Sequence, residues 1–153
     1  MQRKSKRAWQ LAAMLGLALT AGAASAQQPV RQLPNPILYL TGIEPYTTPG
    51  GSFIRYRYDV LNKASYPAAM FAAAPNLPPC GLNANAARTW VDFYVGNTTQ
   101  RIYGFCALGT PQDLGQIWFS VPEGTVPPSY VSIELIDRQA NIRYRSNLAD
   151  TVM

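Results

Sequence analysis

Carboxylates are the main candidates for acid–base chemistry in this 153-residue chain, which has eight aspartates and glutamates and no histidine. Without histidine the sequence offers no Ser-His-Asp or Cys-His site, no histidine-ligated zinc and no histidine pH switch. Two carboxylates about 5 Å or about 6.5–9.5 Å apart could hydrolyse a glycosidic bond, and the candidate pairs are Glu134 with Asp137 and Asp59 with Asp92. Glu134 and Asp137, however, are an odd number of positions apart and would face opposite sides of a regular strand. We therefore interpret the acids as solvated charges and turn residues and predict no enzymatic activity, with a carboxylate-dependent hydrolase as the alternative.

Arginines occur as two alternating pairs. Arg55 and Arg57 would share one strand face, and Arg143 and Arg145 would share another. If the two strands were neighbours, four guanidinium groups would form a basic stripe able to bind sulfate, phosphate or uronic acid groups. The alternative is that these arginines pair with acids across neighbouring strands of an exposed sheet.

Aromatic residues are the third candidate for a binding surface. Trp90 and Tyr94 are predicted on the outer face of one strand, and Trp118 on the outer face of another. A flat aromatic platform would suit sugar rings or a protein surface. Alternatively, a loop covers these rings, or a one-residue shift in register moves a tryptophan into the core. The candidate binding surface therefore comprises Trp90, Tyr94, Trp118, Arg55, Arg57, Arg143 and Arg145.

The first 26 residues have the pattern of a cleaved secretory signal peptide. A basic start at 1–7 is followed by a mostly apolar run at 8–23 and a small-residue cleavage site at 24–26. The apolar run is short for a membrane span, and no second run follows. In the mature chain, 27–153, Lys plus Arg falls from 13 to 9 while all 8 acids remain, so the net charge falls from +5 to +1. We predict a periplasmic or secreted protein with no transmembrane segment in the mature chain and no nucleic acid partner.

The sequence contains two cysteines, Cys80 and Cys106. In an oxidising compartment such a pair is expected to form a disulfide. The bridge would close a loop of about 25 residues and contribute about 3 kcal/mol on a chain-entropy estimate. Because the spacing is not Cys-x-x-Cys, we interpret the bridge as structural rather than redox-active.

The mature sequence predicts short strands separated by Pro, Gly and Asn turns. Alternation is clearest at 52–62, with Ile54, Tyr56 and Tyr58 on the inner face. The stretch 65–71 is a weaker strand, which Pro67 restricts to an edge or a bulge. After an extended Pro-rich lead-in at 27–36, the expected strands cover 37–43, 52–62, 65–71, 89–95, 101–108, 117–121, 130–136 and 141–148, with a turn-rich loop at 45–51 and a long loop at 72–88. This pattern predicts an all-β fold, a single antiparallel β-sandwich of about seven or eight strands over 37–153.

A YxYxVxN-like strand at 56–62 and a late hairpin at 130–147, set between Pro/Gly loops, resemble bacterial immunoglobulin-like or fibronectin type III-like modules. The resemblance spans about residues 37–152 and implies an antiparallel β-sandwich. As in antibody-type domains, Trp90 lies between the two cysteines, but Cys80 falls in a Pro/Gly loop rather than in a strand. We therefore favour a bridge from loop to strand over one between the two sheets.

Such sandwiches serve adhesion, scaffolding and sugar binding alike, so the fold does not specify the function. We predict an exported, non-catalytic binding module of the cell envelope or extracellular space, with no cofactor and no metal. Its expected partner is another envelope or extracellular protein. The alternative is a carbohydrate-binding module that uses the surface aromatics Trp90, Tyr94 and Trp118.

Overall fold

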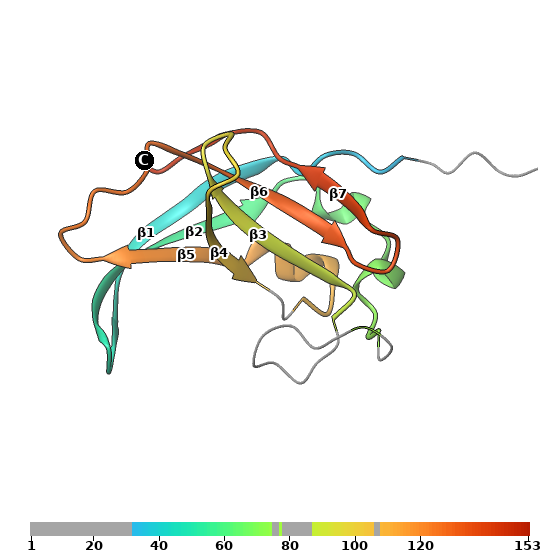
Figure 1. The fold of residues 1–153 in the computed structure, drawn as a ribbon, viewed down its shortest axis with the longest axis horizontal. Coiled ribbons are helices and arrows are strands. Elements are labelled where there is room, and N and C mark those ends of the chain that lie inside the picture. The colour runs from blue at the N-terminus through green and yellow to red at the C-terminus, as the bar shows by residue number, and fades with distance from the viewer. Residues whose placement is uncertain (1–31, 75–76, 78–86, 106–107) are drawn as a thin grey trace, which may run out of the picture. The chain divides into compact units, whose positions relative to one another are not determined.

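The computed structural model describes residues 32–74, 77, 87–105 and 108–153, which are mostly strand with short 3-10 helices between them (Figure 1). Residues Gln32–Met153 belong to one compact unit. The strands are β1 (Leu38–Thr48), β2 (Gly51–Val60), β3 (Thr89–Val95), β4 (Arg101–Phe105), β5 (Ile117–Pro122), β6 (Tyr130–Asp137), β7 (Ile142–Arg145) and β8 (Ala149–Asp150), and the 3-10 helices are η1 (Lys63–Ser65), η2 (Ala68–Phe71) and η3 (Pro111–Gly115).

The described strands form two antiparallel sheets, which confirms the predicted all-β class. The first sheet has the order β1-β2-β5, and the second has the order β4-β3-β6-β7. Because β3 pairs along β6 from Val131 to Asp137, both β7 and β8 lie on the other edge of β6. There β7 pairs with the end of β6 and β8 with its beginning, so the last part of the chain forms one interrupted edge strand.

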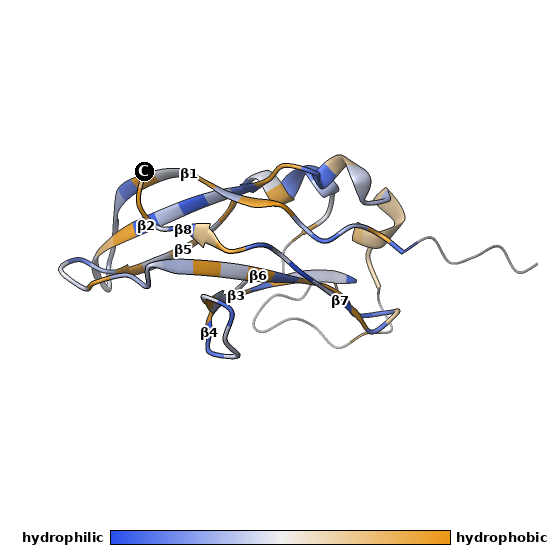
Figure 2. Cartoon of the chain, turned by 90° about the horizontal axis from the view of Figure 1, so that it is seen from above, coloured by the Kyte–Doolittle hydropathy of each residue, from blue (hydrophilic) through white to orange (hydrophobic). Residues whose placement is uncertain are grey.

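The core lies between the two sheets and follows the predicted alternation. Along β2, Tyr56 and Tyr58 are buried whereas Arg57 is exposed, as the sequence pattern predicts. In Figure 2, strongly hydrophilic bands alternate with paler ones along the middle of this strand. The rings of Tyr58 in the first sheet and Phe93 in the second have centroids 5.6 Å apart, and Phe119 of β5 lies 5.6 Å from Phe93 and 5.9 Å from Tyr58. These three fully buried rings join the sheets, because each removes a large apolar area from water.

The predicted strand at 65–71 is wrong, because this stretch forms η1, a short extended link and η2. Pro67 has no N–H to give to a sheet, and it stands instead as the cap before η2. Tyr66 lies at the end of η1, and Met70 and Phe71 lie in η2; all three are buried.

The first hairpin is longer than predicted. The stretch 45–51 was expected to be a loop, but β1 continues to Thr48 and pairs there with Gly51. Pro45 is tolerated because β1 is an edge strand, where one N–H can be missing from the ladder. The tight turn ends at Gly51, whose φ of 132° is strained for any residue with a side chain.

Several predictions fall on residues outside the described part of the chain. These are the signal peptide, the disulfide between Cys80 and Cys106 and most of the long loop at 72–88. Among the residues that the structure describes, no helix is long and apolar enough to cross a membrane.

Two polar contacts tie the end of the chain to the first sheet. Asn147, between β7 and β8, donates from Nδ2 to the Leu38 carbonyl at 3.0 Å, and its Oδ1 accepts from the Leu38 N–H at 2.7 Å. Tyr58 reaches across the core and donates its hydroxyl to the Asp150 carbonyl at 3.0 Å. Burial raises the pKa of Tyr58 further above neutrality, which favours the protonated phenol that donates this bond. The side chain of Asn147 therefore supplies the donor and the acceptor that a neighbouring strand would otherwise provide for Leu38.

Replacing Asn147 with alanine should lower the free energy of unfolding by about 1–2 kcal/mol, because two hydrogen bonds to the β1 backbone are lost. Amide hydrogen exchange should accelerate at Leu38, whose N–H would lose its acceptor. Gln139→Ala, at an exposed amide in the turn after β6, is the matched control and should leave both quantities unchanged. Unchanged protection of Leu38 in the Asn147 variant would show that this contact does not hold the edge.

Candidate functional site

The seven residues predicted as a binding surface lie on two different outer faces. Arg55, Arg57 and Trp118 lie outward on the first sheet, since Arg57 pairs with Trp118 in register. Trp90, Tyr94, Arg143 and Arg145 lie outward on the second sheet. The stripe of four arginines therefore does not form, because β2 and β7 belong to different sheets.

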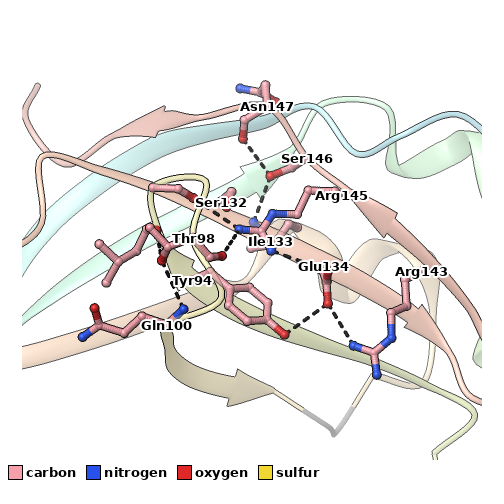
Figure 3. A network of polar contacts seen from close by, with 12 residues as sticks. Tyr94, Thr98, Gln100, Ser132, Ile133, Glu134, Arg143, Arg145, Ser146 and Asn147 are labelled. Atoms are coloured by element: carbon pink, nitrogen blue, oxygen red, sulfur yellow. Dashed lines mark hydrogen bonds and ion pairs between the residues drawn. The ribbon is translucent and has the colours of Figure 1, made fainter.

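On the outer face of the second sheet, Glu134 is the centre of a polar network (Figure 3). It accepts hydrogen bonds from the Tyr94 hydroxyl at 3.1 Å and from Arg143 at 3.0 Å, and it forms an ion pair with Arg145 at 3.5 Å. Burial and the hydrogen bond to Glu134 raise the pKa of Tyr94 above its ordinary value. These contacts join β3, β6 and β7, so the carboxylate serves to hold three strands together.

The aromatic rings of this second face are covered by arginines. The guanidinium carbon of Arg145 lies 4.4 Å from the centroid of Tyr94, and that of Arg138 lies 4.5 Å from Trp90. Tyr94 is only 9 % exposed. Arg145 also donates to the carbonyl of Thr98 in the turn after β3, at 2.9 Å, which fixes its position over the ring. Trp90 and Tyr94 therefore do not present the open, flat platform that the sequence predicts.

The candidate carboxylate pairs are kept apart. Glu134 faces outward, whereas Asp137 lies on the opposite face of β6, where Arg88 binds it with two hydrogen bonds of 2.8 and 2.7 Å. Burial acts to raise the pKa of Asp137, but the hydrogen bonds from Arg88 and from the backbone N–H groups after it bring that pKa below its ordinary value. Asp137 is therefore ionised at neutral pH, and both of its carboxylate oxygens accept hydrogen bonds from Arg88.

The second candidate pair is divided between the sheets. Asp59 of β2 binds Lys63 at 2.6 Å, and Asp92 of β3 binds Arg101 at 2.8 Å. In neither pair do the two carboxylates lie on the same sheet face. Within the described residues, no group of three or more His, Cys, Asp or Glu side chains could hold a metal ion.

The outer face of the first sheet carries a different arrangement, which Tyr103 of the neighbouring strand β4 in the second sheet completes. We call it the aromatic–arginine cluster: Tyr46, Phe53, Arg55, Tyr103 and Trp118. The guanidinium carbon of Arg55 lies 3.6 Å from the ring centroid of Tyr46 and 4.5 Å from that of Trp118. Tyr103 of β4 stacks on Trp118 with centroids 5.2 Å apart, and Phe53 lies 6.5 Å from Tyr46. Four strands, β1, β2, β4 and β5, thus contribute to one surface.

Sheet pairing explains how the cluster forms. Tyr46 stands directly opposite Phe53 in the β1–β2 hairpin, and Arg57 stands opposite Trp118 in the next pair of strands. Glu44 accepts a hydrogen bond from Arg55 at 3.4 Å, which helps to hold the guanidinium between the two rings. Among the described residues, the buried Nε of Arg55 has no hydrogen-bond partner. This part of the guanidinium is therefore held by packing against the two rings.

The sequence predicts two of the five cluster members as outward-facing site residues and does not predict the other three. Arg55 and Trp118 face outward as predicted, but Phe53 and Tyr103 were not named. Phe53 could have been found, because it is two positions before Arg55 and the same alternation places it on the same face. Tyr46 was placed in a loop, and Tyr103 belongs to the other sheet, so neither contact follows from local pattern.

The cluster consists of four aromatic side chains and one guanidinium group. Tyrosine, tryptophan, phenylalanine and arginine are enriched in protein–protein interfaces. Arg57, half-exposed, and Glu44 lie at its rim and pair at 3.8 Å. A scan against protein-family models, a search of the curated proteins and a search of the solved structures each returned no match for this chain. The function therefore has to be argued from these residues themselves.

Proposed function

We propose that the mature chain is a non-catalytic protein-binding module that acts outside the cytoplasm, with the aromatic–arginine cluster as its contact surface. The observation that carries this proposal is the packing of Arg55 between Tyr46 and Trp118 on an outer sheet face. Tyrosine, tryptophan and arginine are the residues that most often dominate binding energy in protein interfaces. Because these side chains already hold one another in place, a partner would bind a surface with little conformational freedom left to lose.

Location outside the cytoplasm rests on the signal-peptide pattern of residues 1–26. In that compartment Cys80 and Cys106 would form a structural disulfide. The expected partner is another envelope or extracellular protein.

The strand order supports an immunoglobulin-like sandwich as the scaffold. In a constant-type immunoglobulin domain, strands one, two, five and four form one sheet, and strands three, six and seven form the other. Here β1, β2 and β5 share the first sheet, and β3, β6 and β7 share the second. The arrangement differs in β4, which joins the second sheet. Domains of this class present binding surfaces on sheet faces and loops and need no catalytic centre.

The carbohydrate-binding alternative has less support than the protein-binding proposal. Arginines cover Trp90 and Tyr94, and Trp118 packs between Arg55 and Tyr103. A sugar ring needs an open aromatic face on which to stack. Of the three aromatic residues of this alternative, Trp90, Tyr94 and Trp118, only Trp118 belongs to the aromatic–arginine cluster.

Trp118→Ala should reduce partner recovery at least tenfold, because truncating a central aromatic of an interface commonly costs about 2 kcal/mol or more. The measurement is quantitative copurification of the tagged mature chain, 27–153, from an envelope extract of its own organism. Wild type should recover one protein in near-stoichiometric amount. Arg57→Glu, at the half-exposed rim, tests the same surface with less risk to the fold.

Tyr130→Ala is the matched control, because this exposed tyrosine begins β6 in the other sheet. It should recover as much partner as wild type, and each variant should show an unchanged circular dichroism spectrum. A partner that stays bound to both cluster variants would contradict the assigned surface. Retention of the isolated domain on a polysaccharide, lost in Trp118→Ala, would support the carbohydrate alternative instead, and turnover of a glycan at enzyme-like rates would contradict a non-catalytic role.

A further inference from the structure

A groove of about 500 Å³ opens between β1 and the end of the chain that carries β8. Polar and apolar groups share its lining, and four of its apolar or aromatic residues are exposed: Tyr39, Leu148, Val152 and Met153. Apolar side chains beside a few polar groups at a concave site are the mixture from which binding sites are built. The groove lies at the edge of the first sheet, away from the aromatic–arginine cluster on its outer face.

The backbone of β1 offers unpaired hydrogen-bonding groups at this groove. The strand pairs with β2 on one side, and among the described residues no strand pairs with its other edge. The N–H and C=O of Leu38 point to that edge, because both bond to the side chain of Asn147. In an antiparallel pair the direction alternates, so the N–H and C=O of Leu40 are directed to the same edge. Leu40 lines the groove, and Asn147 shows that this edge accepts a donor and an acceptor held as in a strand.

The charge of the groove also selects its occupant. Asp150 is exposed and lines the groove, and within the described part of the chain its carboxylate forms no ion pair. Five of the other seven acids are paired with a lysine or an arginine: Glu44, Asp59, Asp92, Glu134 and Asp137. Asp113 and Glu123 form no ion pair among the described residues, but neither lines the groove. Asp150 therefore places one exposed negative charge beside the groove, where a cation on a bound segment would meet it.

We propose that this groove binds an extended segment of a partner protein, which adds as a strand to the edge of β1 at Leu40. The segment places alternate apolar side chains against Leu40 and Leu148 and a lysine or arginine against Asp150. Main-chain hydrogen bonds then provide affinity, and the apolar and charged positions provide specificity. This inference goes beyond the protein-binding role of the aromatic–arginine cluster and does not depend on it.

The test uses three synthetic peptides of about nine residues, which is long enough to form one complete strand. The first alternates threonine and valine and carries a central lysine, the second carries glutamate in place of the lysine, and the third is the lysine peptide with alternate backbone nitrogens methylated. Each is labelled with fluorescein and titrated with the mature chain, 27–153, at low salt. The lysine peptide should bind saturably with Kd below about 1 mM, and the glutamate and methylated peptides should bind at least tenfold more weakly.

Variants of the chain assign the binding to the groove. Leu148→Arg should abolish binding, whereas the control Val126→Arg, at an exposed valine before β6, should not change it. Asp150→Lys should reverse the preference so that the glutamate peptide binds more tightly. Because Asp150 is exposed, this reversal can be measured even if Leu148→Arg fails to fold. Trp118→Ala should leave peptide binding unchanged, because Trp118 lies in the aromatic–arginine cluster and not in the groove. The proposal for the cluster and the proposal for the groove can therefore fail independently.

Three outcomes would overturn the proposal. The first is no binding of the lysine peptide at about 1 mM protein. The second is binding that backbone methylation or Leu148→Arg leaves intact. The third is self-association of the chain that Leu148→Arg abolishes, which would make a second copy of the chain the occupant.

Discussion

Replacing Phe119 with alanine should lower the free energy of unfolding by about 3–5 kcal/mol, the usual cost of removing a fully buried phenylalanine. Phe119 is inaccessible to solvent and contacts Tyr58 within its own sheet and Phe93 in the other. Its loss leaves a cavity at the point where the two sheets meet, and rings held by β2 and β3 cannot move far enough to fill it. The measurement is urea unfolding of the mature chain, with the slope of the transition compared between variants.

Tyr130→Ala is the matched control for this measurement, because it also removes an aromatic ring but at an exposed position. It should change stability by no more than about 0.5 kcal/mol. Phe119→Leu should fall between the two, since it keeps most of the apolar volume. If Phe119→Ala cost no more than Tyr130→Ala, these rings would not be the contact that joins the sheets.

Asp137→Ala should destabilise the fold by about 3 kcal/mol, because it leaves the guanidinium of Arg88 without its two hydrogen bonds in a largely buried place. It also removes the acceptor of the N–H groups of Gln139 and Ala140, which shape the turn between β6 and β7. We place the value at the lower end of the range for broken buried pairs, since Arg88 is partly exposed. The double variant Arg88→Met with Asp137→Leu should recover part of the loss, because it removes both charges together.

The same pair should make stability depend on pH. The pKa of Asp137 is lower in the folded chain than its ordinary value of about 3.9, so the ionised form is favoured by folding. Its contribution is fully present above that ordinary pKa and is lost as the pH falls through the folded pKa. The stability difference between wild type and Asp137→Asn should therefore be constant from about pH 7 to pH 5 and shrink below about pH 4. A difference that persists unchanged at low pH would contradict the role assigned to the ion pair.

The sequence by itself determined which residues of each central strand face the core. Tyr56 and Tyr58 are buried and Arg57 is exposed, and Val91 and Phe93 alternate with outward Trp90 in the same way. This succeeds because the side-chain period of a strand is two, a property that a few neighbouring residues express without help from the rest of the chain. The same rule correctly separated Glu134 from Asp137.

The sequence was less reliable where one local signal competed with another. Apolar residues at 65–71 suggested a strand, yet the chain forms two short 3-10 helices joined by extended backbone at Tyr66 and Pro67. Prolines and threonines at 45–48 suggested a loop, yet an edge strand tolerates Pro45. In both places the environment supplied by the tertiary structure decided between two acceptable conformations.

Only the tertiary structure decided which surfaces those faces build. Whether Arg55 and Arg143 share a surface depends on which strands pair, and β2 pairs with β5 while β7 pairs with β6. Whether Tyr94 is open to a ligand depends on Arg145, which arrives from a strand about fifty positions later and covers the ring. Such contacts are set by pairing and packing between distant segments, and the period of a strand carries no information about its neighbour. Alternation therefore fixed the inner and outer faces, whereas sheet order placed the aromatic–arginine cluster on one side of the molecule and the Glu134 network on the other.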